Sequence, residues 1–237
     1  MISSQTDARR LSPFHHKQAS LNAQFTVDQF GWARAEKYTE PATEKAGVDQ
    51  GVGVADLSHM TKLKLNGRGL RQLISERYKS ATPNMKGRVL VDGRGIYANV
   101  SCAMFSVDEG MLVCNEPLKD RIIKELTGGK TGHFTIVDVS SVFAACSLIG
   151  PNGRTLLRRL TELNVNPEAF PNLSVTHTPI RHVPTILIRN DNGSTLAYQM
   201  YVERAYAEYV WDAIFDSGKE LGVVPVGSLA MRLMGFS

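Results

Sequence analysis

The chain has 237 residues and a mass of 26.1 kDa, enough for one large domain or two small fused ones with a sizeable buried core. Its 43% hydrophobic and 21% charged residues exclude a disordered or fibrous chain and are typical of a soluble globular protein. The net charge of +4 comes from Lys and Arg residues scattered among acidic ones, so we expect no nucleic-acid partner and at most a preference for small anionic ligands.

Residues 1–50 come first and show little hydrophobic periodicity. We predict that they wrap the outside of the protein or close a cleft. The first residues of the chain contain no continuous apolar stretch, so they do not resemble a secretory signal. Apolar runs such as residues 142–149 are too short to span a bilayer. We therefore expect a cytoplasmic protein with no membrane partner.

The next recognisable pattern occurs twice, in residues 61–74 and residues 145–160. Each copy begins with an apolar strand pattern, passes through an Asn-Gly-Arg triplet that starts at Asn66 or Asn152, and ends in leucines at helical spacing. Both copies are followed by β-branched stretches, turn residues and an amphipathic helix. This similarity predicts an internal duplication.

The fold class predicted from this pattern is α+β, built from a strand-helix-antiparallel-strands-helix unit that is used twice. Repeat 1 would cover about residues 51–140 and repeat 2 about residues 141–237, packed as one compact domain with pseudo-twofold symmetry. The later elements expected in chain order are residues 87–91, 96–107, 111–114 and 117–126 in repeat 1, and residues 184–189, 195–202 and 204–217 in repeat 2. A ligand is expected where the two halves meet.

The cysteines and histidines do not form a recognisable metal or disulfide pattern. Cys102, Cys114 and Cys146 lie in apolar, strand-like stretches without a CxxC pair, so we predict that they are reduced core residues. His177 and His182 lie an odd number of positions apart on an expected extended segment and would point to opposite faces. No metal site is predicted.

Several stretches of the chain resemble, in the same order, the aminomethyltransferase or T-protein family of the glycine cleavage system. These stretches are SPFHHKQASLNAQF at residues 12–25, FGWARAEKY at 30–38, GVGVADLSHM at 51–60, LVCN at 112–115, SLIGP at 147–151 and PVGSLAMR at 225–232. The resemblance covers nearly the whole chain. It implies a folate-binding domain in which tetrahydrofolate enters a central hole between the repeats and accepts a one-carbon unit.

The resemblance also implies a set of residues that contact the cofactor. Met60 corresponds to the family's methionine that packs on the pterin ring, and Asn115 to an asparagine that contacts the ligand. Tyr198 and Gln199, in the family's hairpin, and Arg232, in the last signature, complete the implied cofactor-binding set. Judged from the residues alone, Met60 is equally well a core methionine beside a strand, and Asn115 a turn residue that caps the following helix.

The chain departs from the family at three places. Family transferases carry an Asp-Asp pair where this chain has Ala98 and Asn99, and an amide at Asn99 cannot accept a proton at neutral pH. Gln199 stands in place of a glutamate that binds the pterin ring, with an expected loss on the order of 1–3 kcal/mol in affinity. Family transferases continue beyond the position of Ser237 into a further domain, so we expect a homo-oligomer or a partner subunit to cover that face.

The leading hypothesis is a tetrahydrofolate-dependent one-carbon (methyl or methylene) transferase, with Asn99 as the residue that positions the substrate in the catalytic site. The substrate would be a small molecule other than the lipoyl-carried aminomethyl group. One alternative is a non-catalytic folate-binding or regulatory subunit of a larger complex. Another is a repurposed enzyme of secondary metabolism that no longer uses folate.

Overall fold

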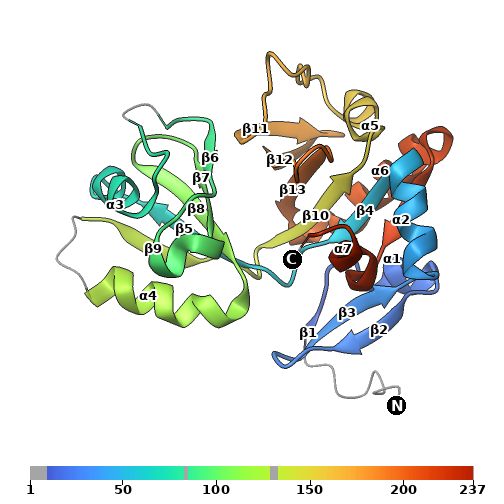
Figure 1. Ribbon diagram of the computed structural model, residues 1–237, viewed down its shortest axis with the longest axis horizontal. Helices are drawn as coiled ribbons and strands as arrows, with labels where there is room; N and C mark the ends of the chain where they lie inside the picture. The colour runs from blue at the N-terminus through green and yellow to red at the C-terminus, as the bar shows by residue number, and fades with distance from the viewer. Residues whose placement is uncertain (1–9, 83–84, 129–132, 237) are drawn as a thin grey trace. The chain divides into compact units, whose positions relative to one another are not determined.

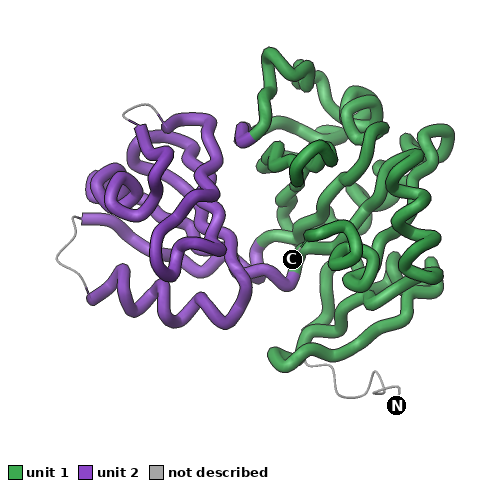
Figure 2. The backbone as a smooth tube through the Cα atoms, viewed as in Figure 1, with its two compact units in different colours: residues 1–58, 143–172, 177–237 green, residues 59–142, 173–176 purple. Residues whose placement is uncertain are grey.

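The computed structural model describes residues 10–82, 85–128 and 133–236 and divides into two compact units (Figure 2). Unit 1 consists of residues 1–58, 143–172 and 177–237, and unit 2 of residues 59–142 and 173–176. The chain therefore leaves unit 1 after Ser58 and returns to it at Phe143. Residues 1–9 of the stretch considered above as a possible signal lie outside the described residues. No helix in the described ranges is both long enough and apolar enough to cross a membrane.

Unit 1 contains a mostly antiparallel sheet with the strand order β14-β4-β10-β13-β12-β11 and a smaller sheet with the order β1-β3-β2 (Figure 1). Its strands are β1 (Arg10–Leu11), β2 (Gln24–Val27), β3 (Trp32–Lys37), β4 (Val52–Asp56), β10 (Phe143–Ile149), β11 (Ser174–Ile180), β12 (Val183–Arg189), β13 (Ala197–Glu203) and β14 (Val223–Val226). Its helices are α1 (His15–Ser20), α2 (Pro41–Gln50), α5 (Gly153–Leu160), η4 (Arg204–Tyr206), α6 (Ala207–Gly218), η5 (Lys219–Leu221) and α7 (Ser228–Leu233). The first residues of β11 belong to unit 2.

Helices α5 and α6 cover one face of the large sheet because each presents an apolar stripe to it. The core on this face contains leucines of α5, Trp211 and Ile214 of α6, and inward-facing residues of β4, β10 and β13. Val48 of α2 and Ala230 of α7 pack on the opposite face. The strand β10 is buried along nearly all of its length, as its apolar sequence predicts for a strand covered on both sides.

The buried carboxylate of Glu44 joins the N-terminal segment to the rest of unit 1. One carboxylate oxygen accepts the backbone N–H groups of Tyr38 at 2.6 Å and Thr39 at 2.9 Å, and the other accepts that of Gly227 at 2.8 Å. This side chain therefore connects α2 to the end of β3 and to the start of α7. Residues 10–50 form regular elements although their hydrophobic periodicity is weak. The periodicity is weak because α2, a ten-residue helix, buries only Glu44 and Val48.

Unit 2 contains a sheet with the strand order β6-β7-β8-β5-β9 and two α-helices on one of its faces. Its elements are β5 (Thr61–Asn66), α3 (Leu70–Arg77), β6 (Arg88–Leu90), η2 (Gly95–Asn99), β7 (Ser101–Met104), β8 (Glu109–Cys114), η3 (Glu116–Leu118), α4 (Lys119–Gly128) and β9 (Thr135–Asp138). Residues from four of these strands and from both α3 and α4 form one buried core. Ser174, at the start of β11, pairs with Arg88 of β6.

The two units have corresponding strand connections. In unit 2 the strand β5 pairs with β8, and in unit 1 the strand β10 pairs with β13, so in each unit the strand that opens the recurring pattern pairs with the strand that precedes the amphipathic helix. The Asn-Gly-Arg triplets, however, are not structurally equivalent. Asn66 is the last residue of β5, whereas Asn152 lies beyond the end of β10 and is the N-cap of α5. The corresponding positions are Gly67 and Gly150, which follow their strands with φ angles of 143° and 120°. The duplication and the single compact domain stay predictions.

The expected strand at residues 96–107 is wrong in its first part. Gly95–Asn99 forms the 3₁₀-helix η2, and the strand begins only at Ser101. Within η2 the buried ring of Tyr97 packs edge-on against Tyr78, with ring centroids 6.1 Å apart. The β-branched and aromatic residues of this segment favoured a strand, but burial of Tyr97 and the local turn hydrogen bonds determine the observed conformation.

Candidate functional site

Two of the implied cofactor residues, Met60 and Asn115, lie at neighbouring strand ends in unit 2. The strands β5 and β8 pair with Thr61 opposite Cys114, so Met60 directly precedes this last pair and Asn115 directly follows it. Met60 is half-buried, so part of its side chain stays open to solvent. The exposed side chain of Asn115 makes no capping hydrogen bond to η3, so the helix-capping alternative is wrong. Their contact with a cofactor stays a prediction.

Asn99 lies at the same end of this sheet, although not on a strand. The strand β7 pairs with β8 through Ser101 and Val113, and Asn99 ends η2 just before β7 begins. Its side chain is exposed to solvent. The expected strand position of Asn99 is therefore wrong. The structure nevertheless brings it to the same group of strand ends as Met60 and Asn115.

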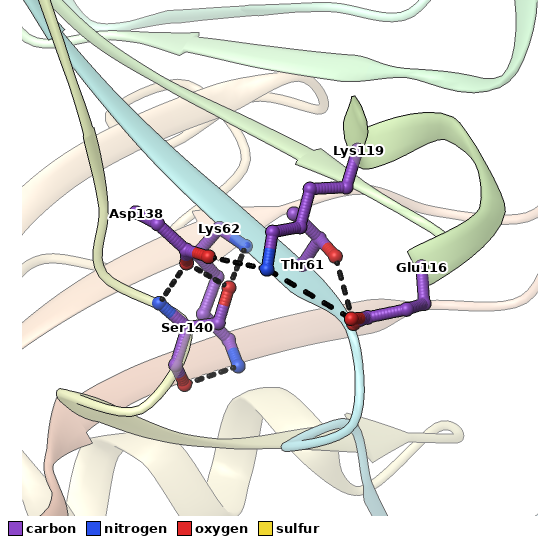
Figure 3. Close-up of polar contacts among 6 residues, drawn as sticks. All are labelled: Thr61, Lys62, Glu116, Lys119, Asp138 and Ser140. Carbon is purple, nitrogen blue, oxygen red and sulfur yellow. Dashed lines mark hydrogen bonds and ion pairs between the residues drawn. The ribbon is translucent and has the colours of Figure 1, made fainter. Parts of the chain in front are cut away.

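A polar network that the sequence did not predict holds these strand ends together (Figure 3). Glu116 accepts a hydrogen bond from the Thr61 hydroxyl at 3.2 Å, and its carboxylate lies 3.9 Å from the Lys119 ammonium. Lys119 forms an ion pair with Asp138 at 2.7 Å. Asp138 also accepts the backbone N–H of Ser140 at 2.9 Å and its hydroxyl at 2.5 Å. The network therefore joins the start of β5 to η3, to the start of α4 and to the end of β9.

The charges in this network support one another. Burial opposes ionisation of Asp138, but the hydrogen bonds from Lys119 and Ser140 outweigh it and lower the pKa of Asp138. The same bond raises the pKa of Lys119. Lys62 is fully buried and donates to Ser140 twice, from its backbone N–H to the hydroxyl at 2.9 Å and from its ammonium to the carbonyl at 3.4 Å. The only sequence signal for these residues is that some of them directly follow Met60 and Asn115.

In unit 1, Tyr198 and Gln199 are neighbours on β13 and therefore point to opposite faces of the sheet. Tyr198 has an exposed fraction of 0%, lies in the core with α5 and α6, and stacks on Phe170 with ring centroids 6.4 Å apart. A side chain with no exposed surface cannot touch a ligand in this conformation. The implied contact between Tyr198 and a cofactor is therefore wrong, and the structure assigns Tyr198 to the core.

Gln199 lies on the other face of the same sheet, in a row with Ala55 and Ser147 from the neighbouring strands. Its amide oxygen accepts a hydrogen bond from the Tyr201 hydroxyl at 2.9 Å. Ser147 donates its own hydroxyl to the carbonyl of Tyr198 at 3.2 Å. Because its oxygen is engaged, Gln199 can offer a ligand chiefly its amide N–H donors.

The last implied residue, Arg232, is exposed on α7, which packs against β3. Burial lowers the pKa of Arg34 on β3, and the nearby charge of Arg232 lowers it further, while Asp28 and Asp56 oppose the shift. The structure therefore places Arg232 in the neighbourhood of another arginine. The sequence reasoning did not single out Arg34, Asp28 or Asp56.

The three cysteines are confirmed as core residues. Cys146 lies in the core of unit 1, and Cys102 and Cys114 lie in that of unit 2. Burial raises the pKa of all three thiols, that of Cys114 to about 12, which keeps them protonated and unreactive. Across the described residues, no group of three His, Cys, Asp or Glu side chains could hold a metal ion.

A protein-family model described as the GCVT N-terminal domain matches residues 14–236. An aminomethyltransferase of Halothermothrix orenii is 24% identical over 210 residues, which cover 85% of this chain and 57% of that protein. The mitochondrial dimethylglycine dehydrogenase of Mus musculus is 26% identical over 210 residues, covering 85% of this chain and 24% of that protein. The chain thus spans little more than half of the first relative and about a quarter of the second.

Two solved structures are similar over most of the chain. The glycine cleavage system aminomethyltransferase T from Bartonella henselae has a TM-score of 0.75 at 16% identity, covering 93% of this chain and 60% of that one. A chain of the heterotetrameric sarcosine oxidase from Corynebacterium sp. U-96 has a TM-score of 0.63 at 18% identity, covering 92% of this chain and 99% of that one. These likenesses establish a shared mixed α/β fold.

Proposed function

Because the chain belongs to the GCVT N-terminal domain family, we propose that it binds tetrahydrofolate or a derivative and takes part in the transfer of a methyl or methylene unit. Relatives named aminomethyltransferase and dimethylglycine dehydrogenase support this class of function. The observation that carries the proposal is the convergence of Met60, Asn99 and Asn115 at one end of the sheet of unit 2. When bound, tetrahydrofolate supplies the nitrogen atoms that carry the one-carbon unit.

The side chains present fit a folate in type. The half-buried thioether of Met60 can pack on a flat ring, and the exposed amide of Asn115 can both donate and accept. Tyr198 is left out of this set because it is buried. The cofactor contact of Gln199, which belongs to unit 1, stays a prediction.

Asn99 supports a substrate other than the lipoyl-carried aminomethyl group. Its amide is neutral, so it can orient a substrate by hydrogen bonds but cannot accept a proton or pair with a developing positive charge. Its exposed position on η2 also leaves water to compete for the same hydrogen bonds. In this proposal the chain contributes mainly by holding the reactants close together.

Calorimetric titration of the full chain with tetrahydrofolate and with its methyl and methylene forms tests the proposal. Met60→Ala and Asn115→Ala should each weaken binding about 5- to 150-fold, the equivalent of ~1–3 kcal/mol. The matched control is Asn66→Ala, an exposed asparagine at the opposite end of β5, which should bind as the wild type does. Failure of every reduced folate to bind would sink the proposal.

Restoring a carboxylate by Asn99→Asp tests the role of that residue. An exposed aspartate ionises near pH ~4, so the variant should differ from the wild type at pH 7 by several-fold in ligand affinity and match it below about pH 3. The measurement is the pH dependence of folate binding for both proteins. Equal affinities across the whole range would remove Asn99 from the site.

A second candidate is a non-catalytic folate-binding or regulatory subunit of a larger complex. Its support is the match to 99% of one chain of a heterotetrameric oxidase, whereas the match covers 60% of the aminomethyltransferase structure. Turnover of a one-carbon substrate by the purified chain alone would exclude this candidate. Native mass spectrometry of the purified protein addresses the third hypothesis, because a bound small molecule that is not a folate would favour a repurposed enzyme.

A further inference from the structure

Positively charged side chains gather on one face of the small sheet of unit 1. Arg10 and Trp32 lie directly opposite each other in the parallel pair β1-β3 and therefore share a face. Arg34 follows two positions after Trp32 and points to the same side. The guanidinium of Arg10 lies over the Trp32 ring, 5.8 Å from its centroid. Arg232 adds a further charge near Arg34 from α7.

The Arg34 guanidinium is half-buried and has no matched anion. Within the parts of the chain that the structure describes, it forms no ion pair and no hydrogen bond. Desolvation of a cation costs free energy, and the nearby Arg232 adds repulsion. The charge of Arg34 therefore lowers the stability of the folded protein when no anion is bound.

The two carboxylates that influence Arg34 are already engaged elsewhere. Asp28 accepts the backbone N–H groups of Phe30 at 2.9 Å and Trp32 at 3.0 Å, closing the turn before β3. Asp56 accepts the side-chain amide of Gln18 at 3.0 Å, and its other oxygen accepts a backbone N–H at 2.8 Å. Both acids thus serve the local structure and reduce the positive charge only at longer range.

A second, independent observation lies next to Arg34. Trp32 is 8% exposed, and its indole N–H is buried without a hydrogen-bond partner among the described residues. Buried polar groups in proteins are nearly always hydrogen-bonded, so such a donor calls for an explanation. Trp32 and Arg34 share one face of β3, so an acceptor group bound there lies on the side of both donors.

We propose that Arg34, Arg232 and the indole N–H of Trp32 form a binding site for a carboxylate group in unit 1. The inference does not depend on folate binding, and it assigns Arg232 to this site instead of the implied cofactor set. Arg34 and Arg232 supply two guanidinium groups, and Asp28 and Asp56 reduce their positive charge, which favours a monoanion over a phosphate dianion. The planar guanidinium fork also matches the geometry of a carboxylate.

The test follows the fluorescence of Trp32 in the full chain. The sequence contains two tryptophans, so a Trp211→Phe background leaves Trp32 as the only one, and Trp211 already packs among phenylalanines. Acetate and glutarate are titrated at constant ionic strength, with chloride and inorganic phosphate as comparison anions. We expect a saturable change with the carboxylates that Arg34→Gln and Arg232→Gln weaken at least about tenfold. Arg121→Gln, at an exposed arginine of α4, is the control and should change nothing.

Three results would overturn the proposal: no saturable change with either carboxylate, an equal response to chloride, or tighter binding of phosphate. Unfolding temperatures provide a second readout that a merely structural arginine would not reproduce. Without ligand, Arg34→Gln should be as stable as the wild type or more so, because an unmatched charge is removed. Saturating glutarate should raise the unfolding temperature of the wild type and leave that of Arg34→Gln almost unchanged. Arg34→Lys, which keeps the charge and loses the fork, should bind with intermediate affinity, and wild-type binding by it would also contradict the proposal.

Discussion

At the scale of single residues, each unit carries a neutral amide where the resemblance implies a carboxylate. These residues are Asn99 in unit 2 and Gln199 in unit 1, and an amide donates hydrogen bonds where a carboxylate only accepts them. The carboxylates near the strand ends of unit 2 are Glu116 and Asp138, which are bonded to Thr61 and Lys119 and hold the strands in place. These charged side chains therefore stabilise the structure, and the neutral amide of Asn99 is left to recognise a ligand.

The buried carboxylate of Glu44 permits a prediction about stability. Glu44→Gln keeps the shape but removes the charge and replaces one acceptor by a donor that faces a backbone N–H. We expect it to lower the free energy of unfolding by about 2–4 kcal/mol, because hydrogen bonds to charged groups are strong and a buried donor would lose its partner. Chemical denaturation measures the change. Glu40→Gln, on the exposed residue that precedes α2, is the control and should stay within about 0.5 kcal/mol of the wild type.

The ion pair between Asp138 and Lys119 permits a prediction about pH. The pKa of Asp138 is lowered in the folded state, so the stabilisation is fully present above the ordinary pKa of an aspartate and is lost as the pH falls through the depressed value. The wild type should therefore be more stable than Asp138→Asn at pH 7, and the difference should shrink as the pH falls below about 4. Denaturant titrations at several pH values measure it. A difference that is the same at all pH values would show that the charge plays no part.

At the scale of elements, the ends of strands position the candidate residues. Met60 precedes β5, Asn115 follows β8 and Asn99 precedes β7. Antiparallel pairing brings these three strand ends to the same end of the sheet. In unit 1, Tyr198 and Gln199 are adjacent on β13, and adjacent residues of a strand face opposite sides of the sheet. The pairing register therefore decides which residues can reach a common ligand.

The turn between β10 and α5 permits a prediction at this scale. Gly150 has a φ of 120°, and a Cβ atom there would lie 2.6 Å from the carbonyl oxygen of Val48 and 2.8 Å from that of Gly51. Gly150→Ala should lower the free energy of unfolding by at least about 2 kcal/mol, because both the backbone conformation and the space exclude a side chain. Gly128→Ala, where a Cβ atom would meet nothing within 4 Å, should change it by less than about 1 kcal/mol. Thermal unfolding of both variants makes the comparison, and equal losses would contradict the steric explanation.

At the scale of the whole molecule, the chain forms two units with separate cores. Unit 2 consists almost entirely of one continuous stretch, whereas unit 1 is assembled from three segments that flank it. The core of unit 2 contains residues of β5 to β8 with α3 and α4, and that of unit 1 contains β4, β10 and β13 with α5 and α6. Each unit can therefore respond to a core defect largely on its own.

Core mutations in the two units should expose different peptides to exchange. Leu112→Ala in unit 2 and Leu148→Ala in unit 1 remove side chains that are both 0% exposed, at an expected cost of about 2–5 kcal/mol each. Hydrogen exchange followed by mass spectrometry should show faster exchange mainly in the unit that carries the mutation. If both variants raised exchange equally in both units, the chain would unfold as a single cooperative domain, as the sequence suggested.

Much of the fold could be read from local patterns. The helices expected at residues 117–126 and 204–217 correspond to η3 with α4 and to η4 with α6, and the strand expected at residues 184–189 corresponds to β12. The prediction of a strand at residues 96–107 was partly wrong, because Tyr97 packs in the core and its segment forms the 3₁₀-helix η2. Of the implied site residues, Met60 and Asn115 lie at neighbouring strand ends in unit 2, while Tyr198 belongs to the core of unit 1.

The sequence by itself determined the α+β class, the positions of most elements, the family and the neutral chemistry of Asn99 and Gln199, because these depend on side-chain type and local spacing. Only the tertiary structure decided which side chains meet. The pairing of Lys119 with Asp138 and the unmatched charge of Arg34 both depend on residues from separate elements. The physical reason is that strand register and helix packing are collective properties, and they set distances, burial and charge balance that no single stretch of sequence contains.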